Sequence, residues 1–402
     1  MNQNNTRKLL VGYFAYECGR AMYFVLVTWF LFQWTENALY TGLFVSFGFI
    51  PGLFSNIIFG VLVDRYNRKT LASLAGLLSI FVLIMLWSAF LLDWINPWGV
   101  IITHMFLQTT GSLFRPSLQA LVAEVFKPEE LPRIFSLSGS ATISGSLTGA
   151  GLGGVFSSFL PISLALFIVI IFYLAASLMI YLLNYKPLFE RKDEEHSQFF
   201  KEIHSGFKYL HEHRMLYGLF VMMMLGQLTF HTTLGFLSVY TSEHLQRSAL
   251  VYGSLDVTFS IGGIAAGILG AWWWRRMQNR MAVYAMFTMA AGLGMLGFFQ
   301  NIGVVFTGIL LIGAGTSIVR ALLQSVQQIA TDRAFHGRMA SFRMLCNQSS
   351  VVITGPLFGW IANENGANFV FLLLLIPVVF GLIWSWFQSK HPQFIEITSK
   401  TA

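Results

Sequence analysis

The sequence predicts an all-α membrane protein with twelve transmembrane helices in two six-helix pseudo-repeats. Of its 402 residues, 55% are hydrophobic and only 11% are charged, whereas soluble domains carry about 25% charged residues. A spanning helix needs about 20 apolar residues, and the chain divides into twelve such segments. These segments are too long, and alternate too little, for a transmembrane β-barrel.

The apolar segments follow one another with short polar connections. A short polar stretch precedes the first segment and no small-residue cleavage site follows it, so we interpret it as a retained span and not a signal peptide. The cysteines Cys18 and Cys346 fall in or near spans, and we expect buried thiols there. The expected spans are residues 9–33, 40–63, 70–92, 98–123, 134–160, 162–184, 215–240, 250–273, 281–300, 302–327, 342–362 and 368–388.

The distribution of positive charge predicts the orientation of the chain. The formal net charge is +7, and 25 residues are Lys or Arg. All of them except four fall in connections on one side. The exceptions are Arg247, in a connection on the other side, and Arg20, Arg115 and Arg320, within spans. Because cytoplasmic loops collect Lys and Arg, we expect both termini in the cytoplasm. The basic balance therefore reflects membrane topology and does not indicate nucleic-acid binding.

The longest polar interval separates the spans six and six. Within it, Phe199, Ile203, Phe207 and Leu210 recur at helical spacing, which predicts an amphipathic helix on the membrane surface. The expected parts are an N-terminal bundle, a cytoplasmic linker and a C-terminal bundle, in residues 1–184, 185–214 and 215–402.

The two halves carry matching polar residues. Arg115 and Gln119 recur as Arg320 and Gln324 at a common offset of 205 residues. Inverted or parallel repeats of this kind are typical of secondary transporters, which bind substrate near the membrane midplane between repeats. The duplication therefore predicts two related bundles.

A charge-dense turn lies between the second and third spans, where residues 60–69 read Gly-Val-Leu-Val-Asp-Arg-Tyr-Asn-Arg-Lys. It resembles the signature loop of the major facilitator superfamily, roughly G-x-L-x-D-R-x-G-R-K. Asn67 replaces the usual glycine, and we expect it to adopt the positive φ that asparagine tolerates. The resemblance implies that Asp64 docks at the start of span 11 and holds the cytoplasmic side closed; the alternative is a simple helix-end charge. The implied gating motif comprises Gly60, Asp64, Arg65, Arg68 and Lys69.

Glycines recur every four positions in the fifth span, a spacing that lets two helices pack closely. The pattern G-x-G-x-x-G at 149–154 formally matches a dinucleotide fingerprint, but no βαβ unit surrounds it. The run resembles the span-5 G-P-x-x-G-G motif of antiporter members of the superfamily, with Ala150 in place of proline. A generic tight helix contact is the alternative. The expected helix-packing motif comprises Gly145, Gly149, Gly153, Gly154, Gly355, Pro356 and Gly359.

Charged residues within spans indicate a site, because each costs about 2.5–3.5 kcal/mol on insertion scales and rarely faces lipid. Glu17 and Arg115 lie at similar depths, roughly 13 Å at 1.5 Å per residue, so we expect them to meet. A carboxylate beside a guanidinium stays ionised, whereas one left buried alone takes up a proton. We therefore interpret Glu17 as the proton-coupling carboxylate and Arg115 and Arg20 as its modulators. The alternative is a self-neutralised structural pair of Glu17 with Arg20.

Polar stripes on the first, fourth, seventh and tenth spans require a wet interior or polar partners. In the superfamily these spans line the central cavity, so the resemblance implies substrate contacts there. The candidate cavity residues are Tyr13, Phe24, Gln108, Ser112, Gln119, Gln227, Arg320 and Gln324. His231 and Asp256 lie at similar depths in the outer half, and we consider them a second proton-coupling pair because His changes charge near neutral pH. The alternative is an isolated buried histidine satisfied by backbone or water.

These features together predict a secondary transporter in a prokaryotic plasma membrane. The Arg115-Pro116 end of span 4 and residues 206–214 are similar to the macrolide-efflux and siderophore-exporter branch, which implies proton-coupled export of an amphipathic small molecule by a monomer in the lipid bilayer. No ATP-binding loop is present, so an ion gradient supplies the energy. We expect no cofactor, metal or nucleic acid. A proton-coupled uptake symporter is the first alternative, and a lipid scramblase or membrane enzyme is the second.

Overall fold

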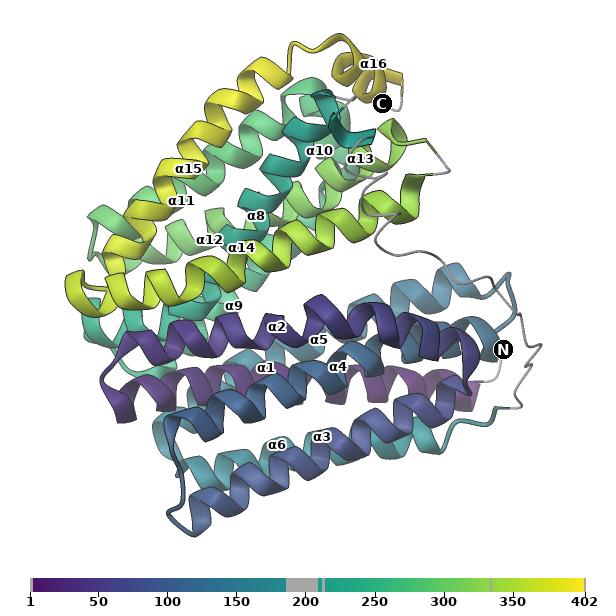
Figure 1. The fold of residues 1–402 in the computed structure, drawn as a ribbon, viewed down its shortest axis with the longest axis vertical. Coiled ribbons are helices and arrows are strands. Elements are labelled where there is room, and N and C mark those ends of the chain that lie inside the picture. The colour runs from purple at the N-terminus through teal and green to yellow at the C-terminus, as the bar shows by residue number, and fades with distance from the viewer. Residues whose placement is uncertain (1–2, 186–208, 212–213, 333–334, 401–402) are drawn as a thin grey trace. The chain divides into compact units, whose positions relative to one another are not determined.

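The computed structural model divides into two compact units, each built from helices, with no strand among the residues it describes (Figure 1). Unit 1 comprises Met1–Glu194 and Arg247–Ser254, and unit 2 comprises Glu195–Gln246 and Leu255–Ala402. The residues whose structure is described are 3–185, 209–211, 214–332 and 335–400.

Unit 1 contains six long helices joined by short turns. Three of them begin at an asparagine whose side-chain oxygen accepts a hydrogen bond from the first turn: Asn37 from Leu39 N, Asn67 from Thr70 N and Asn96 from Gly99 N. Such caps satisfy backbone N–H groups that have no partner within the helix. The helices are α1 (Gln3–Thr35), α2 (Ala38–Arg65), α3 (Arg68–Leu91), α4 (Pro97–Val125), α5 (Leu131–Phe159) and α6 (Ile162–Tyr181).

The expected positive φ of Asn67 is wrong. Asn67 adopts φ −59° and ψ 114°, which is an ordinary conformation for a residue that caps a helix. The turn between α2 and α3 is closed by this cap, with Tyr66 in the extended region. The asparagine therefore replaces glycine through its side-chain acceptor and not through its tolerance of left-handed backbone.

Within unit 1, α1 packs along its length against α5 and α6, α2 packs against α4, and α3 packs against α4 and α6. Glycines set the closest of these approaches. A methyl group at Gly149 would lie closer than 3.0 Å to three backbone atoms of Cys18, and one at Gly145 would lie 2.5 Å from the carbonyl oxygen of Phe14. The backbones of α1 and α5 are therefore in direct contact.

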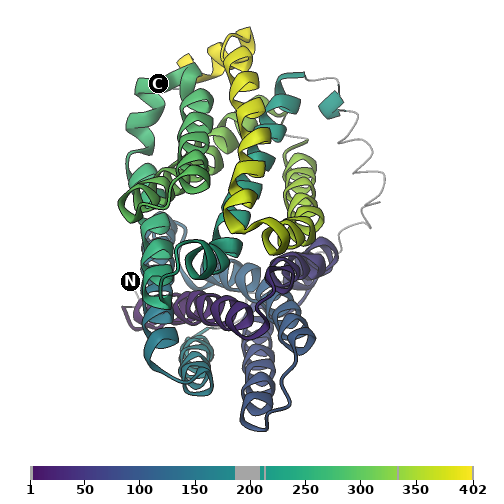
Figure 2. The same ribbon diagram turned by 90° about the vertical axis from the view of Figure 1, so that its left-hand side faces the viewer.

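Unit 2 repeats the plan with more interruptions. Helix α11 packs against α12 and α15, and α8 packs against α14 and α15. Figure 2 shows α15 in yellow with the teal α8 behind it. The elements are α8 (Arg214–Val239), the π-helical turn η1 (Tyr240–His244), α9 (Ala249–Ile268), α10 (Gly270–Met277), the 3₁₀ turn η2 (Gln278–Arg280), α11 (Met281–Phe298), α12 (Ile302–Ile318), the π-helical turn η3 (Val319–Leu323), α13 (Gln324–Ala330), α14 (His336–Asn365), α15 (Ala367–Gln388) and α16 (Pro392–Lys400). The start of α9, up to Ser254, belongs to unit 1.

The twelve expected spans each fall on a long helical segment of the described chain. Among the described residues, eight segments are long and apolar enough to cross a membrane, and the four remaining expected spans fall on α1, α4, α5 and α14. The expected surface helix of the linker lies largely outside the described residues; its end, Tyr209–His211, is helical, with Tyr209 and Leu210 buried. Helix α16, which buries Phe394, was not expected.

Helices α6 and α15 are each tied down at their C-terminal ends. In unit 1, Lys8 Nζ donates to Leu182 O at 2.6 Å, and Asn5 exchanges two hydrogen bonds with the backbone of Asn184. In unit 2, Asn279 donates to Ser389 O at 2.8 Å and Gln388 donates to Met215 O at 2.9 Å. Each half thus has its own hydrogen bonds at the corresponding helix end, and the two halves resemble each other in this respect as well as in their helices.

Candidate functional site

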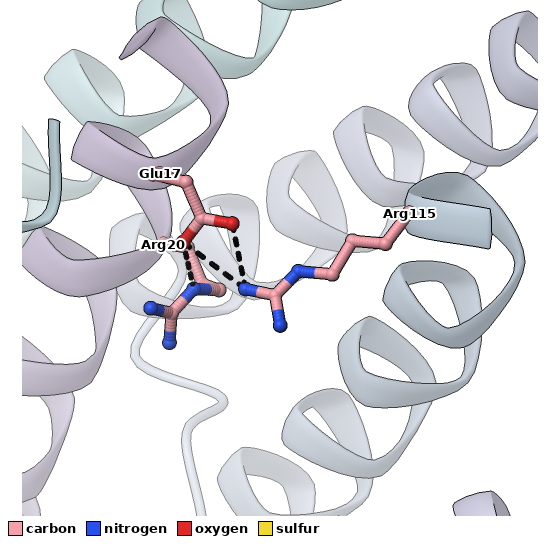
Figure 3. Close-up of polar contacts among 3 residues, drawn as sticks. All are labelled: Glu17, Arg20 and Arg115. Carbon is pink, nitrogen blue, oxygen red and sulfur yellow. Dashed lines mark hydrogen bonds and ion pairs between the residues drawn. The ribbon is translucent and has the colours of Figure 1, made fainter. Parts of the chain in front are cut away.

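A buried carboxylate held by two guanidinium groups lies in the middle of unit 1. Arg20 Nε donates to Glu17 Oε2 at 2.7 Å, and Arg115 Nη2 donates to Oε1 at 2.7 Å and to Oε2 at 3.0 Å. Figure 3 shows Arg115 reaching from α4 to Glu17 on α1, one turn away from Arg20. The expected meeting of Glu17 and Arg115 is thus observed, and Arg20 joins the same carboxylate.

The exposure of the three side chains differs. That of Glu17 is 6% exposed, that of Arg20 is 36% and that of Arg115 is 47%. Charge-assisted hydrogen bonds of this length are the strong class, and both carboxylate oxygens are engaged. The carboxylate is therefore held by hydrogen bonds on both oxygens, and Arg115 is the more exposed of its two partners. The group carries one more positive charge than negative.

Aromatic rings support this ion cluster. Tyr16 stacks on Phe114 with ring centroids 4.2 Å apart, and it meets Tyr173 edge-on at 5.4 Å. The guanidinium of Arg115 lies 5.8 Å from the centroid of the Tyr16 ring, within the range of cation–π attraction. The rings hold α1, α4 and α6 at the level of Glu17.

The other candidate cavity residues of unit 1 lie on α1 and α4. Tyr13 and Gln108 are half-buried and Gln119 is exposed. Ser112 donates back to Gln108 O at 2.9 Å within its own helix, so its hydroxyl already has an acceptor. Phe24 packs beside Phe44 and His104 at centroid distances of 6.0 and 6.4 Å.

His104 belongs to the packing between α2 and α4. Its ring stacks on Phe44 at 3.8 Å, and a methyl group at Gly48 would lie 2.6 Å from its Nε2. Its Nδ1 is buried with no hydrogen-bond partner among the described residues. The ring fills a space that glycine leaves open.

In unit 2 the candidate residues cluster on α8, α9 and the η3 turn. Gln227 and His231 are hydrogen-bonded at 2.6 Å, one turn apart on α8. Asp256 is 8% exposed on α9. Arg320 lies in η3, with its guanidinium 5.8 Å from the centroid of the Phe230 ring on α8. With its amide oriented to satisfy both neighbours, Gln324 accepts from Arg343 at 3.2 Å.

The cations of the gating motif have separate environments. Arg68 forms an ion pair with Glu124, which also accepts a hydrogen bond from Tyr185. Lys69 donates to Leu183 O at 2.9 Å, and Arg65 is exposed. Burial raises the pKa of the Tyr185 hydroxyl, and the nearby Arg68 cation opposes that rise. The side-chain surroundings of Gly60 and Asp64, and so the expected docking of Asp64, lie outside the described residues.

The glycines of the packing motif differ in what they contact. Gly145, Gly149 and Gly153 face α1, and a methyl group at Gly153 would lie 2.8 Å from Val25 Cβ. Gly154 faces Gly253, within the segment that clusters with unit 1. The second copy of the motif lies on α14. Gly355 and Gly359 are buried there, and Pro356 is half-buried within the helix.

Three further residues make polar or ring contacts that no motif indicates. Tyr16 neighbours Glu17, so its aromatic ring beside a charged position was the available signal. Glu124 is a carboxylate near the end of α4, at the level where the cations of the gating motif gather. Arg343, which donates to Gln327 Oε1 at 2.8 Å, lies near the predicted start of span 11 and resembles a loop cation. Among the described residues, no group of His, Cys, Asp and Glu could hold a metal ion.

Sequence comparisons give one family. The profile of the Major Facilitator Superfamily matches residues 9–244 and 219–400. Multidrug resistance protein MdtG of Proteus mirabilis is 24% identical over 367 residues, covering 88% of this chain and 87% of that protein. The multi-drug resistance efflux pump PmrA of Streptococcus pneumoniae is 25% identical over 375 residues, covering 88% and 87%. Macrolide efflux protein A of Streptococcus pyogenes is 21% identical over 289 residues, covering 68% and 69%.

Solved structures give the same fold. The nucleoside transporter NupG is 13% identical, with a TM-score of 0.76, over 97% of this chain and 100% of that one. A bacterial homologue of the lysosomal transporter Spinster, in an inward-facing and unoccupied conformation, is 11% identical, with a TM-score of 0.74, over 99% of both chains. At these identities the likeness concerns the fold alone.

Proposed function

Because the chain belongs to the Major Facilitator Superfamily, and is therefore a multi-pass membrane transporter of small molecules and not an enzyme, we propose that it exports an amphipathic compound in exchange for protons. The names of three relatives, at 21–25% identity, support export of drugs or macrolides. The candidate substrates are drugs, macrolide-like compounds and siderophores. We place a monomer in the plasma membrane with both termini in the cytoplasm.

The observation that carries the proton coupling is the buried Glu17 carboxylate with its two guanidinium partners. In the paired state Glu17 is ionised, and each of its oxygens accepts at least one charge-assisted hydrogen bond. When Arg115 swings away, part of that stabilisation is lost in a poorly solvated place, and an uncompensated buried charge is costly. Glu17 then takes a proton from water, and the return of Arg115 expels it.

The difference in exposure between the Arg115 and Glu17 side chains favours this cycle. Arg115 is 47% exposed, so it reaches water or a ligand while Glu17 stays buried. Arg20 follows Glu17 on the same helix and keeps its contact as α1 moves. We therefore give Arg115 the switching role and Arg20 a permanent one. The contribution of His231 and Asp256 is a second proposed proton site in unit 2.

Transport in everted membrane vesicles tests the proposal. Respiration acidifies the lumen, and erythromycin or a catecholate siderophore added outside should discharge the pH gradient, measured as recovery of acridine orange fluorescence. Glu17→Gln should abolish this recovery, while the exposed Glu36→Gln serves as the matched control and should retain it. Undiminished exchange in folded Glu17→Gln protein would refute the assignment.

Uptake together with protons is the second candidate function, favoured by the fold shared with a nucleoside transporter. The same vesicles separate the two. An exchanger discharges the gradient when substrate is added outside, whereas a symporter discharges it only when substrate is loaded inside.

A further inference from the structure

The strongest feature outside the Glu17 cluster is Arg320 in unit 2. Its side chain is exposed on η3, and among the described residues it has no carboxylate within ion-pair distance. The guanidinium contacts a ring instead, with its carbon 5.8 Å from the centroid of Phe230. A guanidinium within a membrane span is costly and requires water or a counter-charge.

The contrast with unit 1 is informative because the two arginines correspond. Arg115 and Arg320 occupy equivalent positions in the repeat, but Arg115 pairs with Glu17. The position equivalent to Glu17, at the same offset, is Met222, which is fully buried. The second bundle has therefore kept the guanidinium and lacks the resident carboxylate on the corresponding helix.

The surroundings of Arg320 are built to present it. Gly226 on α8 leaves room for Val319, since a methyl group there would lie 2.6 Å from Val319 Cγ1. The π-helical turn Val319–Leu323 widens this helix by one residue at the position of Arg320, and such turns are frequent at functional sites. The Phe230 ring is itself fixed edge-on against Phe259 at 5.3 Å. The guanidinium thus stands over a rigid aromatic platform.

A second guanidinium nearby in the sequence also lacks a carboxylate among the described residues. Arg343 on α14 binds the amide oxygens of Gln327 and Gln324, and both of these glutamines follow Arg320 on the same segment. Neutral amides orient a guanidinium but do not neutralise it. Among the described residues, this part of unit 2 therefore carries two positive charges without a carboxylate partner, Arg320 on η3 and Arg343 on α14.

We propose that Arg320 binds the anionic group of the transported molecule, so that the substrate is an amphipathic organic acid whose apolar part lies against Phe230. This inference rests on the proposed transport function. The substrate supplies the counter-charge that Arg320 lacks among the described residues, through a carboxylate or sulfonate that accepts two parallel hydrogen bonds from the guanidinium. Among the candidate substrates, it favours acidic siderophores over basic macrolides.

Equilibrium binding to purified protein in a neutral detergent tests the proposal without requiring transport. The probes are naphthalene-2-sulfonate, the neutral naphthalene-2-sulfonamide and the cationic trimethyl(2-naphthyl)ammonium, which share one ring system. The wild-type chain should bind the sulfonate at least tenfold more tightly than the other two. Arg320→Gln should remove that preference, and Arg320→Lys should keep part of it. Arg276→Gln, at an exposed position in α10, is the matched control and should bind like the wild type.

Further measurements distinguish binding of a substrate anion from binding of an anionic lipid, and failure of this proposal from failure of the proposed transport function. Phosphatidylglycerol added to the micelles should leave the sulfonate affinity within twofold; full competition would assign Arg320 to lipid and overturn the proposal. Equal affinity for the three probes, preference for the cation, or an unchanged preference in folded Arg320→Gln would also overturn it. If the wild-type chain prefers the sulfonate but shows no proton exchange in vesicles, the result would count against the proposed proton coupling and not against anion binding by Arg320.

Discussion

The contact between α1 and α5 gives a prediction that can be worked from the structure. A methyl group at Gly149 meets the carbonyl oxygen, carbonyl carbon and Cα of Cys18, all closer than 3.0 Å. These are backbone atoms of a helix and cannot rotate aside. By contrast, a methyl group at Gly139, on the same helix α5, has no atom within 4 Å. The pair Gly149→Ala and Gly139→Ala therefore isolates the steric contact.

The magnitudes follow from two opposing effects. Replacing a glycine within a helix by alanine stabilises it by about 0.5–1 kcal/mol, and this applies to both variants. Overpacking costs about 1–3 kcal/mol, and we expect the upper part of that range because backbone faces the new methyl. Gly139→Ala should therefore gain about 0.5–1 kcal/mol, and Gly149→Ala should lose about 1–2.5 kcal/mol.

Reversible unfolding in mixed micelles, titrated with dodecyl sulfate and followed by tryptophan fluorescence, measures both free energies. Gly149→Ala should also reduce proton exchange, because Cys18 is adjacent to Glu17 and its displacement moves the carboxylate from Arg115. If Gly149→Ala proves as stable as Gly139→Ala, the direct backbone contact between α1 and α5 is wrong.

Three further substitutions test other parts of the structure. Asn67→Ala should lower the free energy of unfolding by about 1 kcal/mol through loss of the α3 cap, and glycine there should cost only a few tenths; equal losses in the same micelle titration would contradict the cap. Gly48→Ala should destabilise unit 1 by about 1–2 kcal/mol, because the methyl meets the His104 ring and the overpacking cost of about 1–3 kcal/mol exceeds the helix gain of about 0.5–1 kcal/mol; the double variant with His104→Ala should recover part of the loss. Glu124→Gln should cost about 3 kcal/mol by leaving Arg68 without its carboxylate, and removal of both charges with Arg68→Gln should cost less than Glu124→Gln alone.

Much of the fold was accessible from the sequence because lipid imposes strict lengths on apolar segments. The depth of Glu17 and Arg115 could be counted from the ends of their spans, and a rise of 1.5 Å per residue placed them at one level. The periodicity of small residues at Gly145, Gly149 and Gly153 likewise indicated a helix contact, although not that α1 would be the partner.

Other features depend on geometry that composition does not encode. Asn67 is compatible with positive φ and with a helix cap, and only the position of Thr70 N decides between them. The π-helical turn at Arg320 changes the direction of one side chain without a residue signature. The partner of Arg68 is Glu124, 56 residues further along the chain, so sequence proximity gave no guide to it.

The anchored end of α6 has a mechanical consequence. Tension arriving along the chain beyond Tyr185 is shared at once by α1 through Asn5 and Lys8, by α3 through Lys69, and by α4 through Glu124. A force applied to the chain at this point would therefore act on several helices together and would tend to rotate unit 1 as a rigid body.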